Sequence, residues 1–433
     1  IIGLSLVAMR KKISVSQLRL GMFLDELCGS WLDHPFWKSA FLLTDPKQLK
    51  QIQDSKVKEV WIDIRKGLDV AAEVEAAPET APHHHKERFD DVEIEEADQP
   101  QPDVPMPAAV VNKPTPKPCS VNEELSRASR VIADATPAMR SMFQDARMGK
   151  ALDTEHCLPL VNDITESVQR NPGAIVSLAR LKTSDDYTYM HSVAVCALMV
   201  SLAKQLDLNE TDTREAGMAG LIHDMGKALM PNDVLNKPGA LTNEEFAIMK
   251  KHPEEGHRLL VEGKGVGPVP LDVSLHHHEK MNGSGYPHKL KGDEISLFAK
   301  MGAVCDVYDA ITSNRPYKAG WDPAESIQKM AHWAKEGHFD ERIFQAFVKS
   351  IGIYPIGSLV KLKSGRLAVV MEPGTTSLVC PIVKVFFSTK SNEPIKHTLV
   401  NLGDPKANDA IVARENPTTW GFPNLEALWS KPA

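Results

Sequence analysis

The feature that most constrains the fold is a nearly continuous series of helix signals between residues 120 and 350. Ser120 followed by Glu123 is a capping-box pattern, in which the two residues satisfy each other's backbone N–H groups at the start of a helix. Further on, apolar residues recur at helical spacing in segments that begin at caps or prolines. We therefore expect a mainly α protein built around a helical bundle.

The expected helices follow one another closely and make residues 120–354 the main domain. The clearest of them cover residues 185–206, 211–225, 243–251, 253–262, 271–278, 295–312, 323–335 and 340–350.

Regions of different character flank this bundle. Residues 10–70 predict a small α/β unit with a small core, because strand-like segments surround a helix signal at Asp45, and a regulatory role is a hypothesis. Residues 71–119 are rich in Ala, Glu and Pro and predict a Pro-rich linker. Residues 355–433 are expected to form a small β-rich appendage with a tail, because residues 355–400 change to period-two patterning and the chain is irregular from Asp404.

Composition excludes some classes of function. The net charge of -7 gives no reason to expect a nucleic-acid polymer as partner, although a local basic pocket for a small anion is compatible with it. No apolar run reaches the roughly 18 residues that a membrane span needs. The six cysteines are scattered without a CxxC pair, which favours a reduced, cytoplasmic setting over a disulfide framework or a thiolate zinc site.

Histidines and aspartates gather in the helical region. Six of the 16 histidines, His191, His223, His252 and His276 to His278, lie in or near the segments GLIHDMGK, residues 220–227, and HHHEKMNGSGYP, residues 276–287. Neutral imidazoles together with carboxylates suit borderline divalent metals. Taken alone, His191 is more typical of a core histidine and His252 of a surface or capping residue. A metal site is favoured only when all of these histidines and aspartates are considered together, in this order and on helices.

The order of these residues suggests a site for two ions with one shared carboxylate. The first expected group of ligands comprises His191, His223, Asp224 and Asp306. The second comprises His252, His277 and His278, with Asp224 bridging to it through its other oxygen. Two ions ~3.5–4 Å apart generate a bridging hydroxide and clamp both oxygens of a phosphoryl displacement. If its helix continues, Lys227 lies one turn after His223 and offsets phosphate charge.

Residues 185–355 resemble the HD-GYP domain, a bacterial branch of the HD metal-dependent phosphohydrolases. The resemblance is carried by YTYMHSVAV, LIHDMGK, KHPEEG, HHHEKMNGSGYP and CDVYDAITSNRPYK, in this order. It implies a five-helix metal-binding core and hydrolysis of cyclic di-GMP to linear pGpG, often onward to GMP. It also implies that the seven residues above are ligands and that Lys227 contacts the phosphate.

The same resemblance implies residues that bind the substrate. They are Gly285, Tyr286, Pro287, Arg315 and Lys318. The first three form a loop lip with an aromatic face for a base, and Arg315 offers a planar fork for a phosphate or a guanine edge. The structural alternatives are that Gly285 only forms the turn and that Lys318 is only solvated.

The sequence departs from the family pattern at two places. Met281 and Asn282 stand where the family usually has Trp-Asp, which puts loop packing and substrate affinity in question. Tyr187 stands where some relatives carry a Glu and hold three metals. Because a phenol is normally protonated and is a poor ligand, we expect two ions, with Tyr187 lining the cleft.

Several choices stay open at this stage. Mixed imidazole and carboxylate ligation favours iron or manganese and admits nickel or zinc. One alternative is another HD phosphohydrolase acting on nucleoside phosphates. A second is a catalytically weak HD-GYP domain that binds cyclic di-GMP or a protein and signals by contact. A homodimer or a signalling-protein partner is compatible with either. The N-terminal unit and linker resemble an extension found before some HD-GYP domains of proteobacteria.

Overall fold

The computed structural model describes residues 10–27, 41–53, 57–69, 116–181, 187–237, 239–313, 320–374, 377–422 and 424–430. The chain divides into two compact units, Ile1–Lys113 and Pro114–Ala433, and the boundary falls inside the predicted linker. The expected substrate residues Arg315 and Lys318 lie outside the described residues.

The N-terminal unit is an antiparallel sheet with one α-helix. Its strands lie in the order β1-β4-β2-β3. Their bounds and that of the helix are β1 Arg10–Ser14, β2 Phe23–Leu27, β3 Phe41–Leu42, α1 Pro46–Gln53 and β4 Glu59–Asp63. The predicted small α/β character is therefore confirmed. Its core consists of buried side chains such as Met22, Leu24, Ile52 and Ile62, all at 0% exposure, so the unit has an apolar centre of its own.

The second unit begins with the predicted capping box. The Ser120 backbone N–H donates to the Glu123 carboxylate at 2.8 Å, and the Glu123 N–H donates back to Ser120 Oγ at 3.4 Å. The helix that follows, α2, runs from Val121 to Arg147. Its apolar face packs into the main core through residues such as Val121, Leu125 and Met139.

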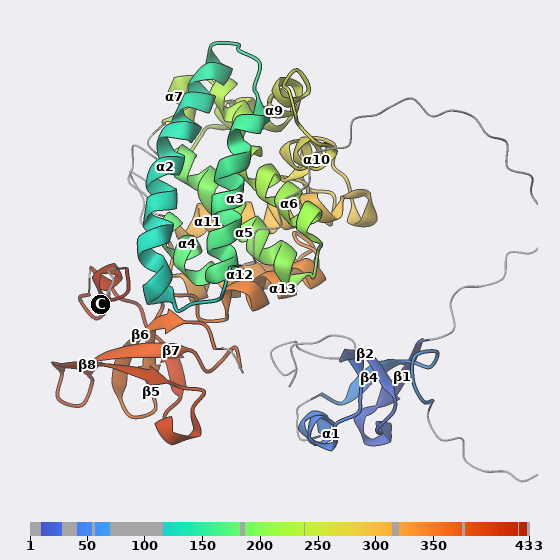
Figure 1. Cartoon of the computed structure of the whole chain (residues 1–433), viewed down its shortest axis with the longest axis vertical. Coiled ribbons are helices and arrows are strands. Elements are labelled where there is room, and N and C mark those ends of the chain that lie inside the picture. The colour runs from blue at the N-terminus through green and yellow to red at the C-terminus, as the bar shows by residue number, and fades with distance from the viewer. Residues whose placement is uncertain are drawn as a thin grey trace, which may run out of the picture. The chain divides into compact units, whose positions relative to one another are not determined.

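The remaining helices form one bundle, seen in the green to orange part of Figure 1. They are α3 Leu158–Arg170, α4 Pro172–Ala179, α5 Tyr187–Gln205, α6 Glu210–Ile222, α7 Asn232–Leu235, α8 Asn243–Met249, α9 His252–Val261, α10 Pro268–His276, α11 Leu297–Thr312, α12 Pro323–Lys335 and α13 Glu341–Ile351. The predicted mainly α fold is confirmed. Among the described helices, none has the length and apolarity to cross a membrane.

Helix α5 is the central element of the bundle. Every residue from Met190 to Ala203 is buried, so the helix is covered on all sides, as expected for a segment that is apolar all round. It packs against α6, α11, α4 and α13. This position places His191, near the N-terminal end of α5, inside the protein.

The prediction for the end of α6 is wrong. A single helix was expected to residue 225, but α6 ends at Ile222 and a 3₁₀ helix, η5, covers Met225–Leu229. His223 and Asp224 therefore lie at a break in the chain direction. Gly226 in η5 is packed so closely on α9 that an added Cβ would lie 1.9 Å from the His252 carbonyl oxygen. The glycine therefore allows His252 to approach Asp224.

The C-terminal region is a five-stranded antiparallel sheet in the order β8-β7-β6-β5-β9. The strands are β5 Leu359–Leu362, β6 Arg366–Glu372, β7 Ile382–Ser388, β8 Glu393–Asn401 and β9 Ile411–Arg414. The β-rich appendage is confirmed, but the tail from Asp404 is not wholly irregular because it contains β9, which pairs with β5. One face of the sheet shares the core of the bundle through Leu359, Leu367 and Phe386, with the tail residue Trp429 buried beside them.

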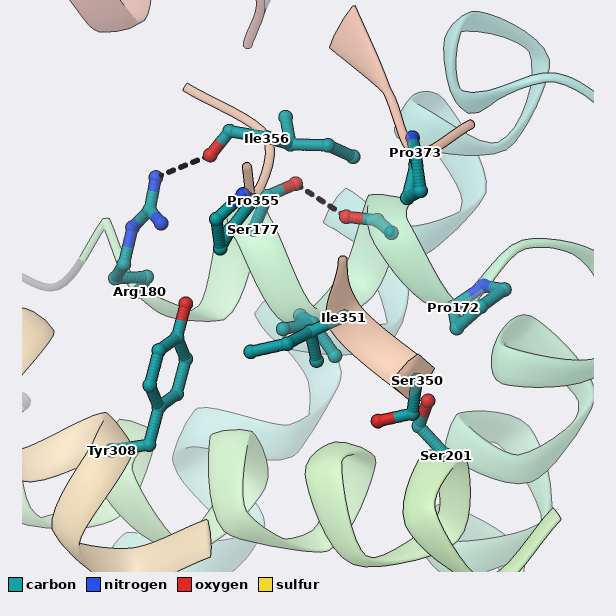
Figure 2. A pocket seen from close by; sticks show the side chains of 12 residues that line it. Pro172, Ser177, Arg180, Ser201, Tyr308, Ser350, Ile351, Pro355, Ile356 and Pro373 are labelled. Atoms are coloured by element: carbon teal, nitrogen blue, oxygen red, sulfur yellow. Dashed lines mark hydrogen bonds between the residues drawn. The ribbon is translucent and has the colours of Figure 1, made fainter. Parts of the chain in front are cut away.

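Figure 2 shows the seam between the sheet and the helices. Arg180, after α4, donates from its guanidinium to the Ile356 carbonyl oxygen at 2.9 Å, and its guanidinium lies 5.6 Å from the centre of the Trp429 ring. The pocket lined by Arg180, Ile356 and Tyr308 has a volume of about 20 Å³. That is room for about one water molecule, so this seam joins the sheet to the bundle and is too small for a nucleotide.

Candidate metal centre

The bundle gathers the seven expected ligands from five places in the chain. His191 comes from α5, and His223 with Asp224 comes from the break between α6 and η5. His252 begins α9, His277 and His278 follow α10, and Asp306 lies in α11. These side chains form two groups, each with ligand atoms within 4.8 Å of one another: His191, His223, Asp224 and Asp306, and His252, His277 and His278.

The first group is built around two carboxylates. His191 Nε2 lies 3.0 Å from Asp306 Oδ1 and 3.3 Å from Asp224 Oδ2. His223 Nε2 lies 3.4 Å from the same oxygen of Asp224. All four side chains are buried. Two imidazole nitrogens and two carboxylate oxygens therefore converge on one small volume that water hardly reaches.

The second group lies on the other side of Asp224. His252 Nε2 is 3.2 Å from Asp224 Oδ1, and His277 Nε2 is 3.7 Å from that oxygen. The two imidazole nitrogens are 3.4 Å from each other. Asp224 thus turns Oδ2 to the first group and Oδ1 to the second, which is the arrangement expected of a carboxylate that bridges two ions.

The other ring nitrogen of each buried histidine is already engaged. The Nδ1–H groups of His223 and His252 donate to the carbonyl oxygens of Gly220 and Met249, both at 2.8 Å, and that of His277 donates to Val273 at 2.9 Å. With Nδ1 acting as the donor, Nε2 presents its lone pair to the centre of the site. Backbone contacts of this kind commonly orient histidine ligands around metals.

His191 is oriented by Asp309, a residue that the sequence analysis missed. Its Nδ1 lies 2.6 Å from Asp309 Oδ2, and Asp309 is buried at 2% exposure. Asp309 follows Asp306 by three positions in α11, so both lie on one face of that helix. The three-residue spacing of Asp306 and Asp309 could have indicated that both face the same neighbour. The identity of that neighbour follows only from the packing of α11 against α5.

Two atoms at the meeting point of the groups have no hydrogen-bond partner among the described residues. They are His223 Nε2 and Asp224 Oδ1, both buried. Polar atoms in such a position carry a desolvation cost unless something satisfies them. A divalent cation on each side of Asp224 would satisfy both atoms, so the residues present fit divalent metal ions.

Burial and charged neighbours strongly shift the pKa values of histidines in this centre. Burial alone would lower the pKa of His191, but hydrogen bonds with Asp224, Asp306 and Asp309 outweigh it and raise the pKa to about 10. Burial, reinforced by neighbouring imidazoles, lowers the pKa of His277 to about 3. The carboxylates around His191 thus favour positive charge at this position.

Lys227 reaches the centre, although not from a continued α6. It lies in η5, and its ammonium group donates to Asp224 Oδ2 at 2.5 Å. Burial would raise the pKa of Asp224, but Lys227 and the neighbouring imidazoles of His223 and His191 outweigh it and hold that pKa well below its usual value. The Lys227 side chain also lines the cleft that opens over the centre.

That cleft has a volume of about 550 Å³, which falls in the range of small-molecule sites. Its floor includes His191, Asp224 and Asp306, and its walls include Arg147 from α2 and Met249 from α8. Tyr187 also lines it, and its ring lies nearly parallel to that of His191, with ring centres 6.1 Å apart. The predicted position of Tyr187 in the cleft is confirmed.

The loop after α10 places Tyr286 against the second group. Its ring stacks on His278 with ring centres 4.7 Å apart. A Cβ added to Gly285 would lie 2.5 Å from the Cα of Glu279, so backbone packing alone accounts for this glycine. Glu279, whose role the sequence analysis missed, accepts the backbone N–H groups of His288 at 2.6 Å and Leu290 at 3.1 Å and so closes the loop.

Asn282 has a structural role in the same loop. Its Oδ1 accepts from the Ser284 backbone N–H at 3.0 Å, and its Nδ2 donates to the Glu336 carbonyl oxygen at 3.0 Å. The amide therefore forms the turn and ties it to the end of α12. A carboxylate could accept the first bond but could not donate the second.

The sequence matches two known protein families. Residues 10–157 match a domain of unknown function, DUF3391, and residues 165–343 match the HD domain. The first match extends beyond the N-terminal unit and includes α2, whose Arg147 lines the cleft.

Individual relatives extend this similarity. The cyclic di-GMP phosphodiesterase PA4108 of Pseudomonas aeruginosa is 51% identical over 98% of this chain and 96% of its own length. The cyclic di-GMP phosphodiesterase response regulator RpfG of Xanthomonas campestris is 31% identical over 54% of this chain and 60% of its own length. The 3'3'-cGAMP-specific phosphodiesterase 1 of Vibrio cholerae is 33% identical over 41% of this chain and 42% of its own length.

Proposed function

Because this chain belongs to the HD-GYP family of cyclic di-GMP phosphodiesterases, we propose that it hydrolyses cyclic di-GMP to linear pGpG at the centre shared by the two ligand groups. The observation that carries this proposal is the orientation of Asp224, whose two oxygens face different ligand groups. A second hydrolysis to GMP is compatible with the same centre.

The metal complement is part of the proposal. The first ion would be held by His191, His223, Asp224 and Asp306, and the second by Asp224, His252, His277 and His278. Two such ions supply Lewis acidity toward the phosphate and activate water as the nucleophile. Iron or manganese suits the mixture of imidazole and carboxylate best, and nickel or zinc is compatible with it.

The chain's own residues would position the substrate over this centre. Asp309 fixes the ring of His191, so the first group is already arranged before substrate arrives. Lys227 lies at the floor of the cleft, where its ammonium group can offset charge on a phosphate oxygen. Tyr286, with Pro287 beside it, offers an aromatic face at the loop, and Arg315 and Lys318 are proposed to hold phosphate or guanine.

The proposal is tested by product analysis with metal-loaded protein. Cyclic di-GMP, 3'3'-cGAMP, pGpG and a nucleoside triphosphate are incubated separately, and the products are separated by chromatography. We expect pGpG to form from cyclic di-GMP. Loss of the triphosphate alone would instead indicate another HD phosphohydrolase. Binding of cyclic di-GMP by calorimetry without any product would indicate a signalling module.

We also propose that residues 10–70 regulate the enzyme and are not needed for hydrolysis. The unit has its own apolar core, and the unit boundary at Lys113 separates it from the helical region. A protein that begins at residue 116 keeps the Cys119 backbone contact with Arg170 and the cap at Ser120. It should bind metal and cleave cyclic di-GMP. Normal metal content without turnover would show that the unit contributes to catalysis.

A further inference from the structure

A run of stacked and edge-packed rings leads from the metal centre to the protein surface. His278, a ligand of the second group, stacks on Tyr286. Tyr286 in turn packs edge-to-face against Phe246, with ring centres 6.4 Å apart and planes at 82°. Phe246 belongs to the short helix α8 and is 44% exposed. An aromatic side chain is therefore held in solvent only two rings away from a ligand.

The apolar core does not explain the position of Phe246. None of the residues of α8 is buried, so this helix contributes little to the core of the bundle. The exposed Lys250 follows the helix and places its ammonium group 4.6 Å from the centre of the Phe246 ring and 5.8 Å from that of Tyr286. Two rings and one cation thus face the same volume at the surface.

Helix α8 also connects this surface to the cleft. Met249 lines the cleft, and its carbonyl oxygen accepts the Nδ1–H of the ligand His252 at 2.8 Å. The chain that carries Phe246 and Lys250 is thereby attached directly to the second ligand group. A substrate whose phosphate lies over the metal centre would have this surface within reach of its base.

We propose that Phe246, Tyr286 and Lys250 form a platform for one guanine base of the cyclic dinucleotide. This inference rests on the proposed function and adds a specificity site to it. A base stacks on an aromatic ring through its π face. Lysine is a suitable donor to the O6 and N7 acceptors of guanine, whereas adenine presents an amino group in place of O6. The platform therefore favours guanine over adenine.

A nucleobase fits this surface better than a partner protein does. The rings begin at a metal ligand, so the platform is continuous with the catalytic centre. It consists of two rings and one lysine, which matches a single base and is small beside the area of a stable protein interface. The nearby cation also suits the anionic phosphates of a dinucleotide.

The test compares Phe246→Ala with the unaltered metal-loaded enzyme on cyclic di-GMP and on methyl p-nitrophenyl phosphate, a diester without a nucleobase. We expect the KM for cyclic di-GMP to rise roughly fivefold or more, the lower range for one stacked base. Hydrolysis of the small diester should fall far less. Phe246→Trp should keep the KM for cyclic di-GMP close to that of the unaltered enzyme, because tryptophan supplies a ring. Phe246→Leu should show the raised KM of Phe246→Ala, because leucine supplies none. Glu244→Gln, an exposed change in the same helix, is the control.

Lys250→Met tests the preference for guanine separately. The ratio of kcat/KM for cyclic di-GMP over 3'3'-cGAMP should fall in this variant. The platform would be overturned if Phe246→Ala left the KM for cyclic di-GMP unchanged. It would also be overturned if this variant lost equal activity on cyclic di-GMP and on methyl p-nitrophenyl phosphate. If the unaltered enzyme cleaves neither cyclic di-GMP nor methyl p-nitrophenyl phosphate, the proposed function fails. Calorimetric binding of cyclic di-GMP to the unaltered protein and to Phe246→Ala then still decides whether the platform exists.

Discussion

The two ligand groups of the metal centre differ in chemistry and in exposure. The first combines two imidazoles with two carboxylates, and the side chain of its most exposed member, Asp306, is only 8% exposed. The second consists of imidazoles alone, and the side chain of His278 is 21% exposed. Its nearest carboxylate oxygens belong to Asp224 and Asp306 of the first group.

This difference makes the second group depend on the first. Two anionic oxygens in a buried, low-dielectric volume attract a dication more strongly than neutral imidazoles do. The first ion should therefore bind more tightly and leave more slowly. In the proposed two-ion site, the second ion would need Asp224 to be in place, and its ligands lie closer to solvent and to the loop that carries Tyr286. Four variants test this asymmetry.

Asp224→Ala should have the largest effect, because both groups lose their shared carboxylate. We expect loss of both ions and a fall in phosphodiesterase activity of roughly a thousandfold or more, since several kcal/mol of transition-state stabilisation depend on the metals. Elemental analysis and product chromatography measure the two losses, and circular dichroism checks that the helices persist. Asp134→Ala, an exposed site in α2, is the matched control. Full turnover with retained metal would refute the shared-carboxylate arrangement.

His278→Ala should separate the two groups. The first group keeps all of its ligands, so the protein should retain about one ion while activity falls by at least about a hundredfold. Metal content after dialysis gives the count. His332→Ala, whose side chain is 73% exposed in α12, is the matched histidine control. Loss of both ions in His278→Ala would contradict the proposed order of binding.

The sequence predicts which side chains converge at the centre because helix signals indicate where each residue occurs. His252 begins α9, and His277 and His278 follow α10, so a prediction of helix ends already placed these residues at the ends of packed elements. Asp309 was missed because its role depends on which face of α11 meets α5, and this is a long-range fact. Lys227 was expected on a continued helix, but the chain turns at Asp224 instead.

Long-range pairing also explains why the sequence did not indicate strand β9 and gave only a weak signal for β8. Strands β5, β6 and β7 carry buried apolar residues, so their patterning was evident. Strand β8 is largely exposed, and β9 is only four residues long and alternates between exposed and partly buried positions. Pairing with a neighbouring strand, and not local apolar patterning, determines that these two segments are extended.

Asp309→Asn should weaken the first group without removing a ligand. The variant keeps the shape of the side chain but loses the negative charge that faces Nδ1 of His191, at 2.6 Å. Changes in such outer partners typically cost 10- to 100-fold in metal affinity or activity. Competition with a chelator measures the affinity of the tighter ion. Asp293→Asn, at a fully exposed carboxylate, should leave it unchanged. An equal affinity in both variants would assign Asp309 a packing role only.

Tyr187→Phe should have the smallest effect. The ring lies nearly parallel to that of His191, and phenylalanine can keep this packing while it removes the hydroxyl group. An ordinary phenol has a pKa of about 10 and is a poor ligand, so the ion count should stay at two and the rate should change by less than about threefold. Tyr187→Glu sharpens the comparison, because a third carboxylate beside the first group should raise the metal content there. Elemental analysis with anomalous scattering gives the count, and a third well-occupied ion beside Tyr187 in the unaltered protein would show that the phenol is itself a ligand.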